Sequence, residues 1–166
     1  FHGAAHQSPM VFQVIVPRAR RDLDCGSTHV QFVARRGMEA TSVVQRNTET
    51  GVLRIASPEA TALELVAYPR HCGYLDNVAT VLVELSERID APSLVKEADR
   101  APIAWVQRLG YLLCRIGAEE LAAHLEDSLA ERRLFTIALA PWKPVAGATC
   151  DSRWKVAVNI DIEPDL

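Results

Sequence analysis

The sequence has few cysteines, and none of them belongs to a short cysteine motif. Cys25, Cys72, Cys114 and Cys150 stand far apart in the 166 residues, so the chain contains neither a CxxC redox pair nor a zinc knuckle. This pattern favours reduced thiols in a cytoplasmic protein. A disulfide between two of the four stays open, because spacing in the sequence does not give distance in the fold.

Long hydrophobic runs and familiar catalytic motifs are also missing. The longest apolar stretches, LELVAYP and ATVLVEL, are too short to cross a bilayer and contain Glu64 and Glu84, which excludes a membrane span. No GxSxG, HExxH or GxxxxGK motif occurs. The usual signals of serine hydrolases, zinc proteases and nucleotide-binding loops are therefore absent from the sequence.

The composition that remains is that of an ordinary globular protein. Hydrophobic residues make up 49% of the chain and charged residues 23%, values that disfavour disorder, collagen and coiled coils. A chain of this length buries roughly 70% of its unfolded surface without cross-links, and we expect one domain over residues 1–166. Because the sequence starts at Phe1 and shows no signal-peptide organisation, we interpret it as part of a longer protein.

The first third of the sequence has the alternation of β-strands. VFQVIVP at 11–17 and HVQFVAR at 29–35 are rich in β-branched and aromatic residues. TSVVQRN at 41–47 precedes the turn TETG, and GVLRIAS at 51–57 follows it. These runs predict three or four strands, partly antiparallel, with a hairpin between the last two.

After Ser57 the hydrophobic period changes to about 3.6 residues, which indicates helices. The start SPEA supplies a capping hydroxyl, a proline at the first helical position and an acidic first turn. Two amphipathic stripes predict further helices over 75–89 and 118–133. Prolines mark the starts of two more, a short helix after Pro92 and a longer one from Pro102 to Gly117.

Strand character returns near the C-terminus. LFTIALAP at 134–141 ends at a proline, and RWKVAVNIDIE at 153–163 alternates over its whole length. Strands, then a block of about four to five helices, then strands again predict an α+β fold, and we expect the C-terminal strands to complete one sheet with the N-terminal ones.

Charge is unevenly distributed along the chain. Residues 1–56 contain seven arginines and four acidic residues, a net charge of +3, whereas the remaining 11 basic and 17 acidic residues give −6. Arginines grouped near strand ends can hold the phosphates of a nucleic acid. The alternative is that these arginines are solvated and paired with Asp22 and Asp24. The candidate phosphate contacts are Arg18, Arg20, Arg21, Arg35 and Arg36.

Other chemical groupings give weaker signals. Asp161 and Glu163 share one face of the last predicted strand, the way a metal-dependent nuclease or nucleotidyltransferase presents its carboxylates, but such a face is usually solvated. His2 and His6 have the i, i+4 spacing of a metal pair without a telling partner. His71 and Cys72 are adjacent, and since neighbours seldom point at each other we assign the thiol to the core.

Five stretches, taken in order, resemble one protein family. These are HGAAHQSP at 2–9, SPEATALELV at 57–66, GYLDNVATVL at 73–82, QRLGYLL at 107–113 and RWKVAVNIDIEPDL at 153–166. Together they are similar to the C-terminal region of the AbiEi antitoxins, which belong to bacterial type IV toxin–antitoxin and abortive-infection systems.

The resemblance implies a non-enzymatic function without a cofactor. Proteins of this family repress their own operon and counteract a nucleotidyltransferase-like toxin without forming a stable complex with it. They carry an N-terminal winged helix-turn-helix that reads operator DNA, for which no sequence is present before Phe1. The resemblance therefore implies an antitoxin part that assists operator binding, and a protein-interaction module without DNA contacts is a further alternative.

Overall fold

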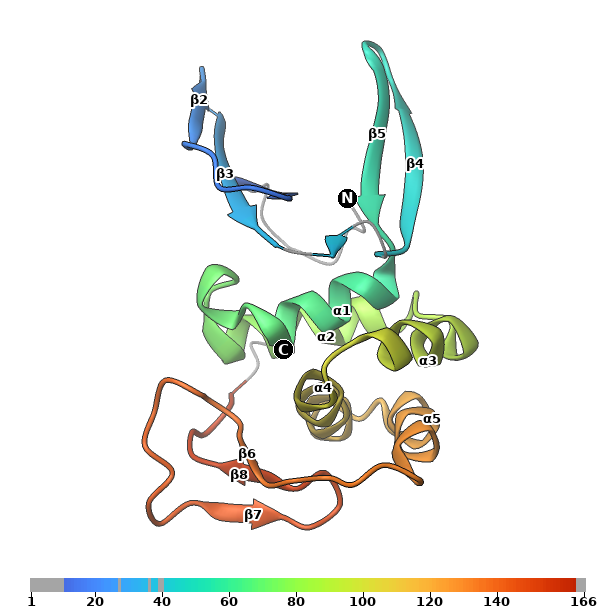
Figure 1. Cartoon of the computed structure of the whole chain (residues 1–166), viewed down its shortest axis with the longest axis vertical. Coiled ribbons are helices and arrows are strands. Elements are labelled where there is room, and N and C mark those ends of the chain that lie inside the picture. The colour runs from blue at the N-terminus through green and yellow to red at the C-terminus, as the bar shows by residue number, and fades with distance from the viewer. Residues whose placement is uncertain (1–10, 27, 36, 39–40, 164–166) are drawn as a thin grey trace.

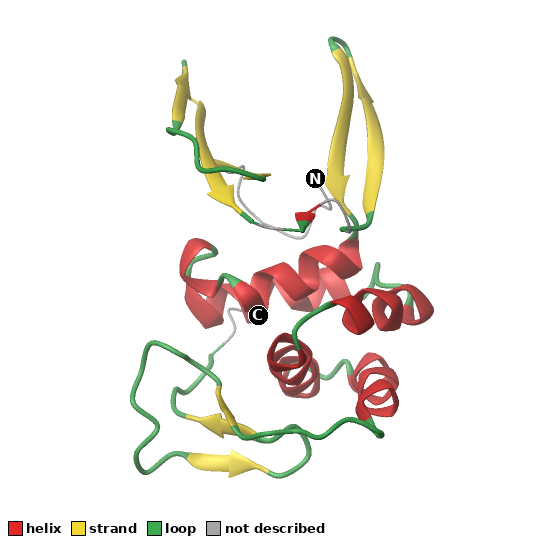
Figure 2. Cartoon of the chain, viewed as in Figure 1, coloured by secondary structure: helices red, strands yellow, loops and turns green. Residues whose placement is uncertain are grey.

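The computed structural model describes residues 11–26, 28–35, 37–38 and 41–163. Two groups of strands project from one side of a helical block, and a small third group lies on the other side (Figures 1 and 2). We call residues 11–34, which contain the first three strands, the sheet arm, and residues 43–56 the hairpin arm. The strands of the two arms are β1 (Val11–Val16), β2 (Leu23–Cys25), β3 (Thr28–Ala34), β4 (Val43–Thr48) and β5 (Gly51–Ala56).

The sheet arm has the strand order β1-β3-β2. β1 runs parallel to β3, from the pair Val11 and His29 to the pair Val16 and Ala34. β2 is antiparallel to β3 on its other side. The short β2 thus lies in the connection between two parallel strands, where a helix is the usual crossover.

The hairpin arm matches its prediction from sequence. β4 and β5 pair in antiparallel register from Val43 with Ala56 to Thr48 with Gly51. The Thr48 hydroxyl donates to the Gly51 carbonyl oxygen at 2.9 Å and closes the turn. Gly51 has a φ of 147°, a conformation that glycine adopts without strain.

Within the described residues, five α-helices and one 3₁₀ turn form the helical block. The Ser57 hydroxyl accepts from the Ala60 amide at 3.2 Å, which confirms the predicted cap. The amphipathic stripes are confirmed as well, since Leu82 and Leu125 are fully buried. No described helix is long and apolar enough to cross a membrane. The elements are α1 (Pro58–Ala67), η2 (Pro69–His71), α2 (Tyr74–Ser86), α3 (Ala91–Arg100), α4 (Ile103–Arg115) and α5 (Glu119–Leu129).

A helical glycine lets the C-terminal segment pack closely on α4. Gly110 is buried in the middle of α4, where a glycine normally costs about 1 kcal/mol relative to alanine. The indole ring of Trp154 fills the space that a Cβ at this position would occupy. Trp154 is 1% exposed, so Gly110 is explained by this contact.

The C-terminal strands are shorter than predicted. They are β6 (Ile137–Ala138), β7 (Thr149–Asp151) and β8 (Val156–Val158), in the order β6-β8-β7. A turn replaces the start of the predicted strand over 153–163, because Lys155 has a φ of 53° and the Trp154 amide donates to Asp151 Oδ1 at 2.7 Å. This turn directs the indole into the core.

The α+β class is confirmed, with strands at both ends and helices between them. The expectation that the C-terminal strands complete one sheet is wrong, because the described strands form three separate small sheets. The physical reason is the position of the helices. β8 packs against α4 on the side away from the arms, so the helical block separates the sheets.

Candidate nucleic-acid interface

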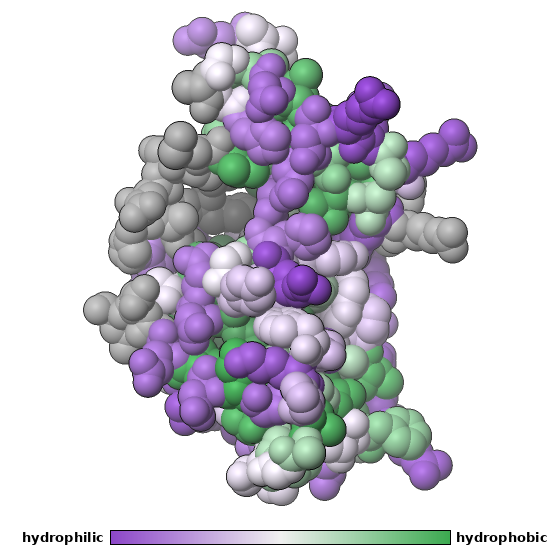
Figure 3. Space-filling view, turned by 90° about the vertical axis from the view of Figure 1, so that its left-hand side faces the viewer, coloured by the Kyte–Doolittle hydropathy of each residue, from purple (hydrophilic) through white to green (hydrophobic). Residues whose placement is uncertain are grey.

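Three of the candidate arginines lie together on the sheet arm. Arg18, Arg20 and Arg21 are exposed in the connection between β1 and β2. Arg20 has its guanidinium carbon 6.0 Å from the centroid of the Phe32 ring, a cation–π contact that holds the charge beside β3. In Figure 3 hydrophilic residues cover much of the strand-built upper part of the molecule, with hydrophobic residues exposed among them.

The nearby carboxylates have other partners. Asp22 Oδ1 accepts from the Phe32 amide at 3.1 Å, and Asp24 Oδ1 lies 2.6 Å from His29 Nδ1. Asp22 Oδ2 lies a further 3.7 Å from His29 Nε2. Within the described part of the chain, no ion pair joins Arg18, Arg20 or Arg21 to a carboxylate. The pairing expected under the solvated alternative is therefore not found there.

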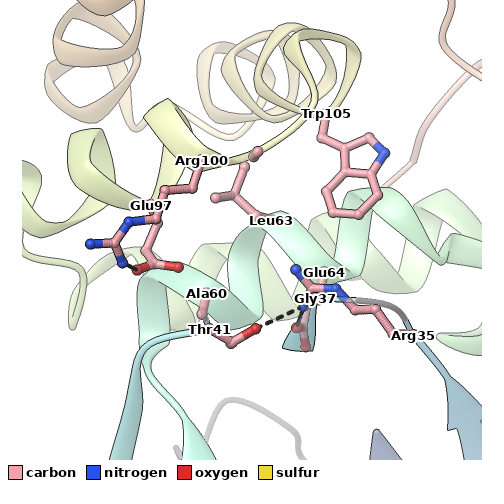
Figure 4. Close-up of a pocket in the computed structure, with 10 residues that line it drawn as sticks. Arg35, Gly37, Thr41, Ala60, Leu63, Glu64, Glu97, Arg100 and Trp105 are labelled. Atoms are coloured by element: carbon pink, nitrogen blue, oxygen red, sulfur yellow. Dashed lines mark hydrogen bonds and ion pairs between the residues drawn. The ribbon is translucent and has the colours of Figure 1, made fainter. Parts of the chain in front are cut away.

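Arg35 differs from these three because it is anchored to the helical block. Its guanidinium donates to Glu64 in an ion pair and to the Thr41 hydroxyl at 3.1 Å. It also lies 5.7 Å from the centroid of the Trp105 ring. The Arg35 and Glu64 side chains are 20% and 14% exposed. This geometry (Figure 4) connects the end of β3 to α1 and α4.

A second carboxylate completes this junction. Glu97, on α3, is buried and accepts a hydrogen bond from the Ser42 hydroxyl, while Arg100 lies 3.4 Å from its carboxylate. Burial raises the pKa of Glu64, an effect that Arg35 opposes and Glu97 reinforces. The partly open cavity at this junction measures about 60 Å³, room for a few water molecules only. The junction thus holds the sheet arm in place.

Some sequence candidates lie outside the described residues. Arg36, His2 and His6 belong to this group, so their predicted roles stay predictions. Cys72 is described, and burial, reinforced by the Glu64 carboxylate, raises the pKa of its thiol to about 11. A thiol with such a pKa is protonated at neutral pH, in line with its assignment to the core.

Among the described residues, the two C-terminal carboxylates do not gather with other acids into a site. Asp161 and Glu163 are exposed and follow β8 rather than lying on a strand. The Glu163 amide donates to Asp76 Oδ1 at 3.0 Å. In the described ranges, no three His, Cys, Asp or Glu residues come close enough together to hold a metal ion.

Sequence reasoning did not single out two surface features. One is the face of the hairpin arm that carries Gln45, Asn47, Val52 and Arg54, whose grouping becomes visible only once the strand register is known. The other is an open recess of about 330 Å³ beside η2, lined in part by Tyr68, His71 and Trp142. For the face of the hairpin arm, the alternation of QRN within 41–47 is the one sequence signal. For the recess beside η2, no sequence signal joins the segments that line it.

Comparison with known proteins identifies the fold and the family. One solved structure, of the RV2827C protein from Mycobacterium tuberculosis, has a TM-score of 0.62 at 16% sequence identity. The match covers 93% of this chain and 57% of that one, so the chain spans a little over half the length of that protein. No curated protein gives a significant match.

The family comparison covers both arms and four of the five described α-helices. The family model described as AbiEi antitoxin C-terminal domain matches residues 1–115. This range contains the three exposed arginines, the junction at Arg35 and the whole hairpin arm. The chain therefore belongs to the AbiEi antitoxin C-terminal domain family.

Proposed function

We propose that this chain is the antitoxin and autoregulatory part of a bacterial type IV toxin–antitoxin system. It acts in the cytoplasm, without catalysis, and counteracts a nucleotidyltransferase-like toxin without forming a stable complex. Family membership supports the antitoxin role. Within the longer protein, the sheet arm adds phosphate contacts that assist binding to operator DNA.

The proposed DNA contacts are supported by one observation, the group of exposed arginines on the sheet arm. Arg18, Arg20 and Arg21 lie within four residues of one another and have no carboxylate partner among the described residues. Guanidinium groups contact phosphates by charge and by paired hydrogen bonds. Arg35, already bound to Glu64, acts as an anchor for the arm rather than as a contact.

A survival experiment tests the antitoxin role. The 166-residue chain is expressed in cells in which the neighbouring toxin gene is induced, and surviving colonies are counted. Survival above the empty-vector level is the expected result. Continued killing by the toxin, with the chain folded and abundant in the same cells, would contradict the proposal.

A binding experiment tests the phosphate contacts separately. Affinity for a 20-base-pair duplex is measured by fluorescence anisotropy between 50 and 200 mM salt for the wild type and for Arg18→Ala/Arg20→Ala/Arg21→Ala. Each lost phosphate contact should reduce the salt slope by about 0.9. The control Arg88→Ala/Lys96→Ala/Arg115→Ala removes the same charge from exposed positions of the helical block. An equal loss in both variants would show a general charge effect and overturn the assignment.

A further inference from the structure

The hairpin arm is an isolated two-stranded ribbon. Apart from Ile55 and Ala56 at its base, every residue of β4 and β5 is exposed, and neither strand pairs with a third among the described strands. Two-stranded hairpins are marginally stable alone in water. The arm also exposes apolar side chains, among which Val52 is 59% exposed. A surface of this kind is suited to being covered by a partner.

The strand register divides the arm into two faces. Directly opposed residues of an antiparallel pair share a face, and successive residues alternate. The face that includes the buried Ile55 also carries Val44, Arg46 and Leu53. The opposite face, which we call the polar face, carries Gln45, Asn47, Val52 and Arg54.

The hydrogen-bonding groups of the polar face have no partners among the residues that the structure describes. The side chains of Gln45, Asn47 and Arg54 form no hydrogen bond or ion pair with any residue in the described ranges. Two amides and a guanidinium are the groups that read base edges: arginine pairs with guanine, and glutamine or asparagine pairs with adenine. Val52 adds an apolar group of the type that contacts the thymine methyl.

The dimensions of the ribbon match those of duplex DNA. The major groove is about 12 Å wide and admits a two-stranded ribbon. Gln45 and Asn47 are two residues apart on one strand, about 6.8 Å. That spacing equals about two base-pair steps of 3.4 Å, so the two amides can face base pairs two steps apart. Gln45 lies directly opposite Arg54 in the register.

Charge favours an anionic partner, such as the phosphate backbone of a nucleic acid, over a neutral or basic surface. The hairpin arm contains Arg46 and Arg54 against the single acid Glu49, which lies in the turn. The neighbouring sheet arm presents Arg18, Arg20 and Arg21 on the same side of the helical block. Phosphate contacts from one arm can therefore position base contacts from the other.

We propose that the hairpin arm is a base-reading element that enters the major groove of duplex DNA with its polar face against the base edges. Arg54 reads a guanine, and Gln45 and Asn47 read adenines. The inference rests on the proposed function, because the phosphate contacts of the sheet arm set the position of the ribbon. It adds sequence specificity, which phosphate contacts alone do not supply.

The test is a binding selection from a pool of 20-base-pair duplexes with randomised centres, read by sequencing. The wild-type chain should enrich sequences with a guanine at one position. Arg54→Ala should reduce that preference by about 5- to 150-fold, the range expected for one bidentate contact. Arg46→Ala is the matched control, since it removes the same charge from the other face of the arm and should leave the preference in place.

Two further variants separate the contact from a folding defect. Arg54→Lys retains the charge but loses the paired donors, so overall affinity should persist while the guanine preference falls. Gln45→Ala/Asn47→Ala should weaken the preference at adenine positions only. Circular dichroism and the salt slope of binding to the unselected pool verify that each variant is folded and still contacts phosphates.

The remaining outcomes separate base reading by the hairpin arm from phosphate contacts by the sheet arm. Binding to the pool without enrichment overturns base reading and leaves the phosphate contacts standing. Enrichment that survives Arg54→Ala and Gln45→Ala/Asn47→Ala also overturns base reading. Absence of all duplex binding overturns both. A dimer in solution whose cross-links map to the polar face would assign that face to a second copy of the chain and overturn the inference.

Discussion

The two arms and the helical block differ in how they are held together. In the block, apolar side chains from all five helices are buried in one cluster with Trp154 and Leu139. Among the described apolar residues of the arms, only Val16 and Ile55 are buried, each 9% exposed. The arms depend on backbone pairing and on a few polar anchors. Apolar surface exposed in the arms is found at Val11, Val14, Leu23, Val43, Val44, Val52 and Leu53.

Charge separates the same two regions. The arms lie within the segment whose net charge is +3, and the block and C-terminal sheet lie within the segment of −6. Because the regions occupy different ends of the molecule (Figure 1), the charge asymmetry of the sequence is also an asymmetry in space. The difference fits the proposal in which the block supplies stability and the arms supply a contact surface.

The largest expected effect is in the helical block. Gly110→Ala places a Cβ against the Trp154 ring and should lower the free energy of unfolding by about 3 kcal/mol, the upper end for an overpacked core. The measurement is urea unfolding followed by circular dichroism. In a Trp154→Leu background the same substitution should cost much less, and an equal cost in both backgrounds would exclude this contact as the cause.

A smaller effect is expected where the sheet arm meets the block. Arg35→Ala leaves the half-buried Glu64 carboxylate without its ion pair and should cost about 2 kcal/mol. Hydrogen exchange should accelerate in β1 and β3 while α4 and α5 stay protected. Arg88→Ala is the charge-matched control, and uniform acceleration throughout the chain would contradict a local anchor.

The cost of Arg35→Ala should also depend on pH. Burial raises the pKa of Glu64 and Arg35 lowers it, so the carboxyl of the variant has a higher pKa than that of the wild type. The unpaired Glu64 carboxylate lowers the free energy of unfolding of the variant only while it is ionised. The difference in unfolding free energy should therefore shrink as the pH falls through the pKa of Glu64, as measured by urea unfolding at several pH values. Glu64→Gln should abolish this dependence.

A still smaller effect is expected at the other end of the block. Arg153 donates to Glu119 at 2.9 Å and to Glu126 at 2.8 Å. Arg153→Met retains much of the chain length but removes both ion pairs, and exposed pairs contribute about 0.5 kcal/mol each. The loss should show in thermal unfolding at low salt and diminish at 1 M salt. A loss that is independent of salt would point to packing on Trp154 instead.

The smallest effect concerns the β2–β3 contact. The hydrogen bond to Asp24 raises the pKa of His29 above 6.5, with a lesser contribution from Asp22. Because the pKa of His29 is higher in the folded than in the unfolded protein, the protonated imidazole stabilises the contact fully below pH 6.5. This stabilisation is lost as the pH rises through the folded-state pKa. An NMR titration of the His29 ring should show the raised pKa, and Asp24→Asn should lower it. An unchanged pKa in that variant would contradict the assignment.

The helices and the hairpin arm were predictable because their signals are local. The cap at Ser57 and the stripes through Leu82 and Leu125 depend on neighbours within a few turns. The pairing of the hairpin follows from one short turn between two alternating runs. Each of these elements formed where the pattern placed it.

Other structural features depend on contacts between residues that are far apart in the sequence, which a local pattern does not reveal. The alternation over 153–163 predicted one long strand, but burial of Trp154 beside Gly110 imposed a turn instead. The parallel pairing of β1 with β3 is a choice between distant segments. Arg35 was grouped with the other arginines because its partner Glu64 is 29 residues away in the sequence.

The short joint between the hairpin arm and α1 has a mechanical consequence. Only Ser57 separates the end of β5 at Ala56 from the start of α1 at Pro58. The Ser57 amide donates to the Ser42 carbonyl oxygen at 2.8 Å, and its hydroxyl caps the helix. Because the amide and the hydroxyl of this single linking residue are both hydrogen-bonded, we expect the orientation of the ribbon to be coupled to that of α1. A force on the tip of the ribbon should then act on the start of α1 and, through it, on the centre of the protein.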